Sequence, residues 1–143
     1  MSVHTRRDLA TLSALARRRF QHALMSDTKW RKLFAAVIDA GQPPQQVVVK
    51  FIHGDQSHVM RWPGDYSLYP PRPWLDTAAL GPIELRAIEW LLVPAMMKEQ
   101  RGAPNVPATE TPQDLSIVRA VLAKLGRFPV EDGPDGLTIF GYR

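Results

Sequence analysis

Two turn-rich segments, each set between short apolar runs, constrain the fold of this 143-residue chain most strongly. The first, residues 53–56, joins the β-branched run 47–52 to residues 57–62, and the second is residues 132–136. Short connections rich in Gly and Asp are typical of β-hairpins, whose strands pair antiparallel. Consecutive hairpins do not fit the alternating strand and helix order of a parallel sheet.

Three segments have the composition and periodicity of helices. Residues 5–24 contain neither Gly nor Pro, residues 28–40 follow the capping residues Ser26 and Asp27, and residues 111–125 end before Gly126. We therefore predict an α+β fold, an antiparallel sheet of four to five strands with about three helices packed on one face. Residues 25–143 form the single domain in this prediction, and residues 1–24 are a basic amphipathic extension.

The connecting segments have no clear periodicity. Residues 63–80 contain four prolines and are predicted to be a long loop. Residues 95–110 contain Gly102, Pro104 and Pro107 and are predicted to be a mobile connector. The apolar pattern of residues 83–93 changes parity midway, which indicates a bulge or a break into two short strands.

Composition excludes several kinds of protein. The chain has no cysteine, so disulfides, zinc–thiolate sites and thiol catalysis are absent. No apolar run reaches the roughly 20 residues that span a bilayer. Residues 5–9 resemble a twin-arginine export signal, but three arginines at 17–19 interrupt the apolar stretch behind it. We expect a cytoplasmic protein, and with no phosphate-binding loop or nucleophile elbow we predict neither a cofactor nor a catalytic residue.

Short segments spaced along the chain carry a family resemblance. They are residues 28–34, 49–52 with 61–63, 81–83 with 88–90, and 126–129 with 136–137 and 141–142. In this order they resemble a family of short bacterial proteins classed only as a domain of unknown function. The resemblance covers about residues 27–143 and implies a compact cytoplasmic domain with no catalytic residues to transfer. Some small families of this kind are immunity proteins against toxins. Residues 1–24 would then be an addition or the product of an upstream start codon.

The proline-rich loop carries the leading functional hypothesis. Prolines restrict a loop, and Tyr and Trp are favoured at protein interfaces. We predict a non-enzymatic protein-binding module, of inhibitor or immunity type, that contacts its partner through Trp62, Tyr66, Tyr69, Arg72 and Trp74. The alternative is that these rings fold back and cover the sheet.

The whole excess of positive charge lies at the N-terminus. Residues 1–24 hold five arginines and one acid, whereas residues 25–143 hold 13 basic and 13 acidic side chains. Association with nucleic acid is one interpretation, through Arg6, Arg7, Arg17, Arg18 and Arg19. Docking of the amphipathic helix on its own domain, or self-association through it, is the other.

The first turn carries two imidazoles and a carboxylate. If residues 54–57 form a four-residue loop, His53 and His58 face each other across the strand ends, with Asp55 between them. Such a set could hold Zn²⁺ with a position left for water, which would make the chain a metal-dependent enzyme. Polar residues also collect at turns simply because they form turns.

Overall fold

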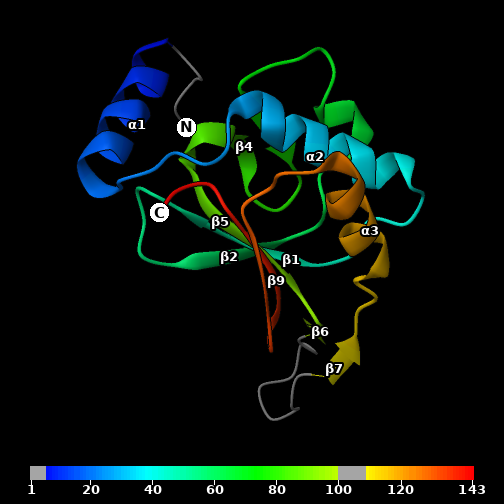
Figure 1. The fold of residues 1–143 in the computed structure, drawn as a ribbon. Coiled ribbons are helices and arrows are strands. Elements are labelled where there is room, and N and C mark those ends of the chain that lie inside the picture. Colours follow the sequence, from blue (N-terminus) through cyan, green and yellow to red (C-terminus); the bar gives the residue numbers. More distant parts are fainter. Residues whose placement is uncertain (1–5, 100–108) are drawn as a thin grey trace.

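The computed structural model describes residues 6–99 and 109–143, which fold around a five-stranded antiparallel sheet (Figure 1). Its strands lie in the order β2-β1-β5-β9-β8. Their bounds are β1 (Val47–Phe51), β2 (Ser57–Met60), β5 (Ile88–Pro94), β8 (Val130–Gly133) and β9 (Gly136–Phe140). The described residues also form three helices, α1 (Arg6–Arg19), α2 (Asp27–Asp39) and α3 (Ser116–Leu125). The predicted α+β fold is confirmed.

Two smaller hairpins correct the predicted connections. β3 (Trp74–Thr77) lies inside the segment 63–80 that was predicted to be a loop, and it pairs with β4 (Gly81–Glu84), which begins directly after that segment. The four prolines of this segment all precede β3, the last being Pro73, so they do not prevent Trp74–Thr77 from pairing. The expected connector contains β6 (Met96–Glu99) and β7 (Thr109–Pro112), which also pair, and residues 100–108 lie outside the described part. The change in apolar parity predicted within residues 83–93 falls at a 3₁₀ turn, η2 (Leu85–Ala87). This turn separates β4 from β5, so the predicted break into two short strands is confirmed.

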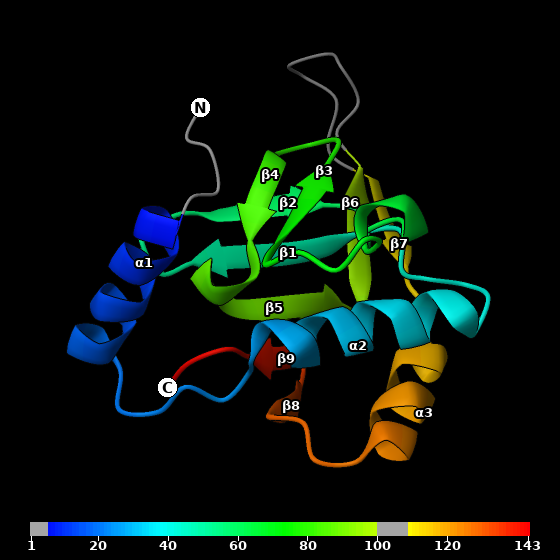
Figure 2. The ribbon, with the colours of Figure 1, turned by 90° about the horizontal axis from the view of Figure 1, so that it is seen from above.

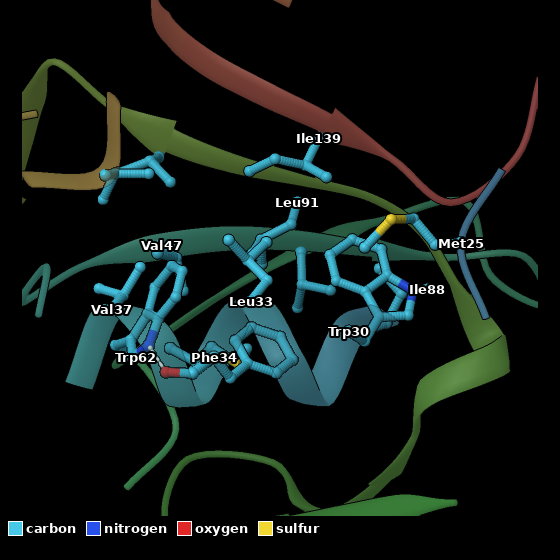
Figure 3. Close-up of a cluster of buried hydrophobic side chains, with 14 of the residues drawn as sticks. Met25, Trp30, Leu33, Phe34, Val37, Val47, Trp62, Ile88, Leu91 and Ile139 are labelled. Carbon is cyan, nitrogen blue, oxygen red and sulfur yellow. Dashed lines mark hydrogen bonds between the residues drawn. The ribbon is translucent and has the colours of Figure 1, made fainter. Parts of the chain in front are cut away.

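α2 follows from local signals. The Ser26 hydroxyl accepts a 3.1 Å hydrogen bond from the Lys29 backbone N–H, which caps the helix as predicted. Its buried face contains Trp30, Leu33, Phe34 and Val37. Figure 3 shows these side chains packed against Val47, Leu91 and Ile139 of the sheet. Burying each such side chain contributes about 1.5–3 kcal/mol, so this layer is the main core.

α3 begins later than predicted. Thr111 and Pro112 were expected to start it, but they pair with Met97 and Met96 in the β6–β7 hairpin. The helix starts instead at Ser116, whose backbone N–H donates to the Asp114 carboxylate at 2.9 Å.

The layers leave one side of the sheet without a helix. α2 and α3 lie on one side of the sheet, and no described helix lies on the other (Figure 1). The β3–β4 hairpin lies on the helix side, over β1 and β2 (Figure 2). α1 packs at the end of the strands, in a separate apolar cluster of Leu12, Ala16, Ile52, Ala87 and Tyr142.

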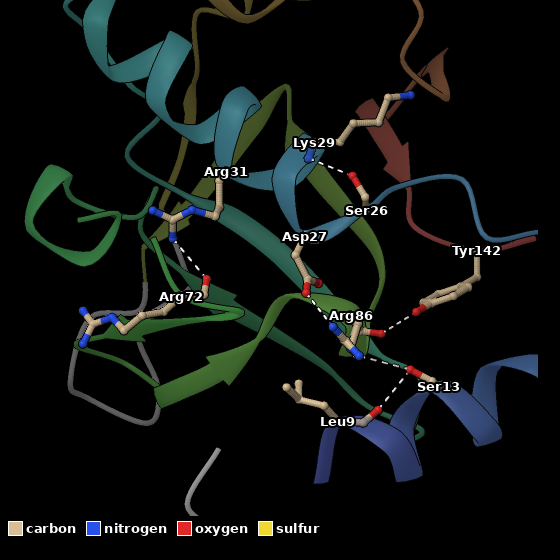
Figure 4. A network of polar contacts seen from close by, with 9 residues as sticks. All are labelled: Leu9, Ser13, Ser26, Asp27, Lys29, Arg31, Arg72, Arg86 and Tyr142. Carbon is tan, nitrogen blue, oxygen red and sulfur yellow. Dashed lines mark hydrogen bonds and ion pairs between the residues drawn. The ribbon is translucent and has the colours of Figure 1, made fainter. Parts of the chain in front are cut away.

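The N-terminal helix ends at Arg19 rather than near residue 24. The chain then turns, and residues 21–24 form backbone hydrogen bonds of 2.8–3.0 Å with Gly141 and Arg143. A side-chain network reinforces this closure (Figure 4). Arg86 pairs with Asp27 of α2 at 2.8 Å and donates to Ser13 of α1 at 3.3 Å. α1 is therefore joined to the rest of the chain by apolar, backbone and ionic contacts.

Candidate functional site

The candidate site is built around β2, one edge of the sheet. Among the described strands, β2 has a neighbour on one side only. Its register with β1 places His58 opposite Val49 and Ser57 opposite Lys50. The turn therefore begins earlier than predicted, because Phe51 leaves β2 and pairs with Ile88 of β5. His53 lies in this turn and does not face His58 across the strand ends.

A first cavity, of about 480 Å³, opens beside the start of β2. Its walls come from α1, the β1–β2 turn, β4 and η2. Two carboxylates and two imidazoles line it among mostly apolar side chains. Its lining residues are Asp8, Thr11, Leu12, Phe51, His53, His58, Leu80, Pro82, Ile83, Glu84 and Ala87. Glu84 is buried, whereas the cavity itself is open to the surface.

The metal hypothesis finds no support in the side-chain arrangement. The rings of His53 and His58 both lie beside the Phe51 ring, with centroid distances of 5.6 and 5.9 Å. Asp55 does not line the cavity. Within residues 6–99 and 109–143, no three side chains of His, Asp or Glu come together as metal ligands.

A second cavity, of about 440 Å³, lies beyond the other end of β2. Residues 60–64 form one wall and residues 76–79 of the β3–β4 hairpin the other. Tyr66 stands at its side, and its ring lies so close to Gly64 that a Cβ there would come within 2.7 Å. The absence of a Cβ at Gly64 thus allows this close approach of the tyrosine ring.

The loop before β3 is anchored from inside. Ser67 and Leu68 are buried, and the Ser67 hydroxyl donates a 2.7 Å hydrogen bond to the Gly64 carbonyl. The tyrosines on either side point outward, with Tyr66 70% and Tyr69 60% exposed. They are the most exposed large apolar side chains in the described part of the chain. This segment therefore holds two aromatic rings in water on a fixed support.

The other predicted contact residues differ in placement. Trp62 is buried and donates through Nε1 to the Phe34 carbonyl at 3.1 Å, so it belongs to the core and not to an exposed surface. The alternative that rings fold back on the sheet holds for this residue. Trp74 is half-buried in β3, and the Arg72 guanidinium lies 4.1 Å from its ring. Among the described side chains, Arg72 Nε is a buried donor without an acceptor.

The described arginines of α1 differ in their contacts. Arg17, Arg18 and Arg19 are all exposed, and Arg19 also donates to the Ile52 carbonyl and lies beside the Phe20 ring. The side chains of Arg6 and Arg7 lie outside the described part of the structure. The apolar stripe of α1 packs on its own domain, as one of the two predicted interpretations expected.

Sequence reasoning missed Asp8, Thr11 and Glu84 as neighbours of the two histidines. No short-range signal joins them, because α1 and β4 reach the first cavity only through the tertiary fold.

No helix in the described residues has the length and apolar character needed to cross a membrane.

Fold and cavities together define a small α+β protein with two recesses at the two ends of β2, the edge strand of the described sheet. Residues 12–143 match the Family of unknown function (DUF6678), and the chain belongs to that family. The match begins within α1 and not near residue 27, so the second half of this helix is part of the family's domain. Comparison with curated proteins and with solved structures gives no match.

Proposed function

We propose that this chain is a non-enzymatic protein-binding module. Its contact surface consists of Tyr66 and Tyr69, the neighbouring Arg72–Trp74 pair and the second cavity. The observation that carries the proposal is the exposure of both tyrosines on a loop whose intervening residues are buried. A fixed loop loses little conformational entropy on binding, and a tyrosine ring provides a large apolar area with a polar tip.

Arg72 and Trp74 extend this surface. The guanidinium already lies over the indole ring, and cation–π pairs of this type are common at binding sites. The positive charge of the Arg72 guanidinium would attract a carboxylate of the partner. Arg and aromatic side chains are the residues that carry most energy in interfaces.

The test uses the full chain as bait in a lysate of its source organism, followed by titration calorimetry with the purified partner. The double substitution Tyr66→Ala/Tyr69→Ala is expected to weaken binding by tenfold or more, since a central aromatic contact contributes about 2 kcal/mol or more. The matched control is Val130→Ala on β8, an exposed apolar residue far from the loop in sequence. Equal affinities for the wild type and the double variant would refute this surface.

Nucleic-acid association through Arg6, Arg7, Arg17, Arg18 and Arg19 stays a prediction. It requires a steep loss of affinity with added salt, because phosphate contacts release counterions. Arg19 is exposed, but its guanidinium already donates to the Ile52 carbonyl, which leaves it fewer N–H groups for phosphate contacts.

A further inference from the structure

The two edges of the sheet differ in their protection against further strand pairing. β8 carries Glu131 and Asp132, both engaged in ion pairs with arginines. Charges of this kind discourage another strand from joining an edge. β2 (Ser57–Met60) contains no Lys, Glu, Asp or Pro, and its Val59 side chain is 56% exposed. Among the described strands, nothing pairs with its outer side.

The two cavities lie at the two ends of this edge, under the same hairpin. His58 lines the first and Met60 the second. Because these residues are two apart, they face the same side of the sheet, and alternate side chains of an added strand have the same spacing. Residues of the β3–β4 hairpin form the opposite wall of both cavities. A strand laid along β2 would therefore direct successive same-side residues into the two cavities.

The charges of the first cavity indicate which kind of side chain the added strand would place there. Asp8 and Glu84 bring two carboxylates to a recess with apolar walls such as Leu12 and Ile83. Each carboxylate has lone pairs for several hydrogen bonds, so it can accept from an ammonium group in addition to its present partners. The apolar walls suit the methylene stem of a long basic side chain.

We propose that the β2 edge binds an extended segment of a partner protein by strand addition, with a Lys or Arg side chain in the first cavity. The inference rests on the proposed protein-binding role and names the chemistry of the partner. A second copy of this chain fits less well. In Figure 2 the turn of the β3–β4 hairpin reaches past β2, and a two-fold axis would bring a second hairpin to the same side. An extended segment of a partner has no hairpin of its own to collide with the β3–β4 turn.

The probe is a blocked seven-residue peptide with a central lysine, valine two residues before and after it, and threonine elsewhere. It is titrated into the ¹⁵N-labelled full chain. We expect saturable shifts of the β2 amide signals and at least tenfold slower hydrogen exchange at the outward amides. Replacing the lysine by norleucine should weaken binding about tenfold, and Asp8→Asn/Glu84→Gln should remove this preference for lysine. Glu131→Gln on β8 is the matched control and should leave the affinity within twofold.

Backbone N-methylation separates strand addition from other binding. Successive residues of a strand direct their N–H groups to opposite edges. Methylating the alternate peptide residues whose N–H groups face β2 should abolish binding. Methylating the other alternate set, whose N–H groups face away, should leave the affinity within twofold. Equal effects of both sets, no binding at millimolar peptide, or a dimer of the free chain broken by Val59→Lys would each overturn the proposal. The tyrosine surface is tested separately, because loss of partner binding in Tyr66→Ala/Tyr69→Ala does not depend on this peptide.

Discussion

The Tyr142 hydroxyl donates a 2.6 Å hydrogen bond to the backbone carbonyl of Arg86 (Figure 4). The same ring stacks on Phe20, with 5.4 Å between the centroids. One side chain near the C-terminus thus joins η2 to the segment that follows α1. Since Arg86 also pairs with Asp27 and Ser13, the residues that hold α1 in place converge on this point.

Removing only the hydroxyl should measure this bond. We expect Tyr142→Phe to lower the free energy of unfolding by about 1 kcal/mol, the usual net value of one hydrogen bond. Urea unfolding followed by tryptophan fluorescence provides the measurement. Tyr69→Phe serves as the control, because Tyr69 is exposed and its change should have no effect. Equal stabilities of Tyr142→Phe and the wild type would show that the bond contributes nothing.

The same hydroxyl should affect stability at alkaline pH. Burial raises the pKa of Tyr142, and the nearby Asp27 carboxylate raises it further. Above pH about 10 the unfolded chain loses this proton while the folded chain keeps it, so stability falls as pH rises. We expect Tyr142→Phe to lose less stability than the wild type as the pH rises above about 10. Denaturant titrations at several pH values would test this, and parallel curves would contradict it.

The ion pair of Arg86 should contribute more than an exposed pair elsewhere in the chain. The Arg86–Asp27 side chains are 33% and 22% exposed, whereas those of Arg119–Asp132 are 46% and 54% exposed. We expect Arg86→Gln to cost about 1–2 kcal/mol and Arg119→Gln less than about 0.5 kcal/mol. Thermal unfolding of both variants at low and high salt gives the comparison. A larger effect at Arg119 would contradict this ranking.

Local signals in the sequence were sufficient for some elements and not for others. The start of α2 is encoded by Ser26, and its buried face by apolar residues at helical spacing. The pairing of β5 with β9, with Leu91 opposite Ile139, joins segments far apart in the chain and has no local signal. The first cavity depends on the same long-range placement. The burial of Trp62 did have a signal, because it continues the inward side of β2 two residues beyond Met60.

Trp62 should therefore behave as a core residue. Trp62→Phe keeps a ring beside Phe34, where the present rings meet edge to face at 5.2 Å, but removes the donor to the Phe34 carbonyl. We expect Trp62→Phe to cost about 1–3 kcal/mol from the lost hydrogen bond and the smaller ring, and Trp62→Ala to cost about 3–5 kcal/mol. Chemical denaturation measures both losses. If either variant were as stable as the wild type, Trp62 would not be a core residue and could again be considered a surface contact.

Gly136 should be the least replaceable glycine of the second large hairpin. It has a φ of +139°, and a Cβ at this position would lie 2.1 Å from the Val93 carbonyl oxygen and 2.9 Å from the Ala95 nitrogen. Both obstacles are backbone atoms of the central strand region, so the neighbours cannot move aside without breaking the β5–β9 pairing. We expect Gly136→Ala to cost more than about 3 kcal/mol, since a positive φ alone accounts for about 1–3 kcal/mol.

Gly126 provides the matched control for this effect. It also has a positive φ, +96°, but a Cβ there would meet nothing within 4 Å. Gly126→Ala should therefore cost only the backbone strain, about 1–3 kcal/mol. Equilibrium unfolding of the two variants separates strain from steric contact. If both substitutions cost the same, the close approach of Gly136 to β5 is not what requires glycine at that position.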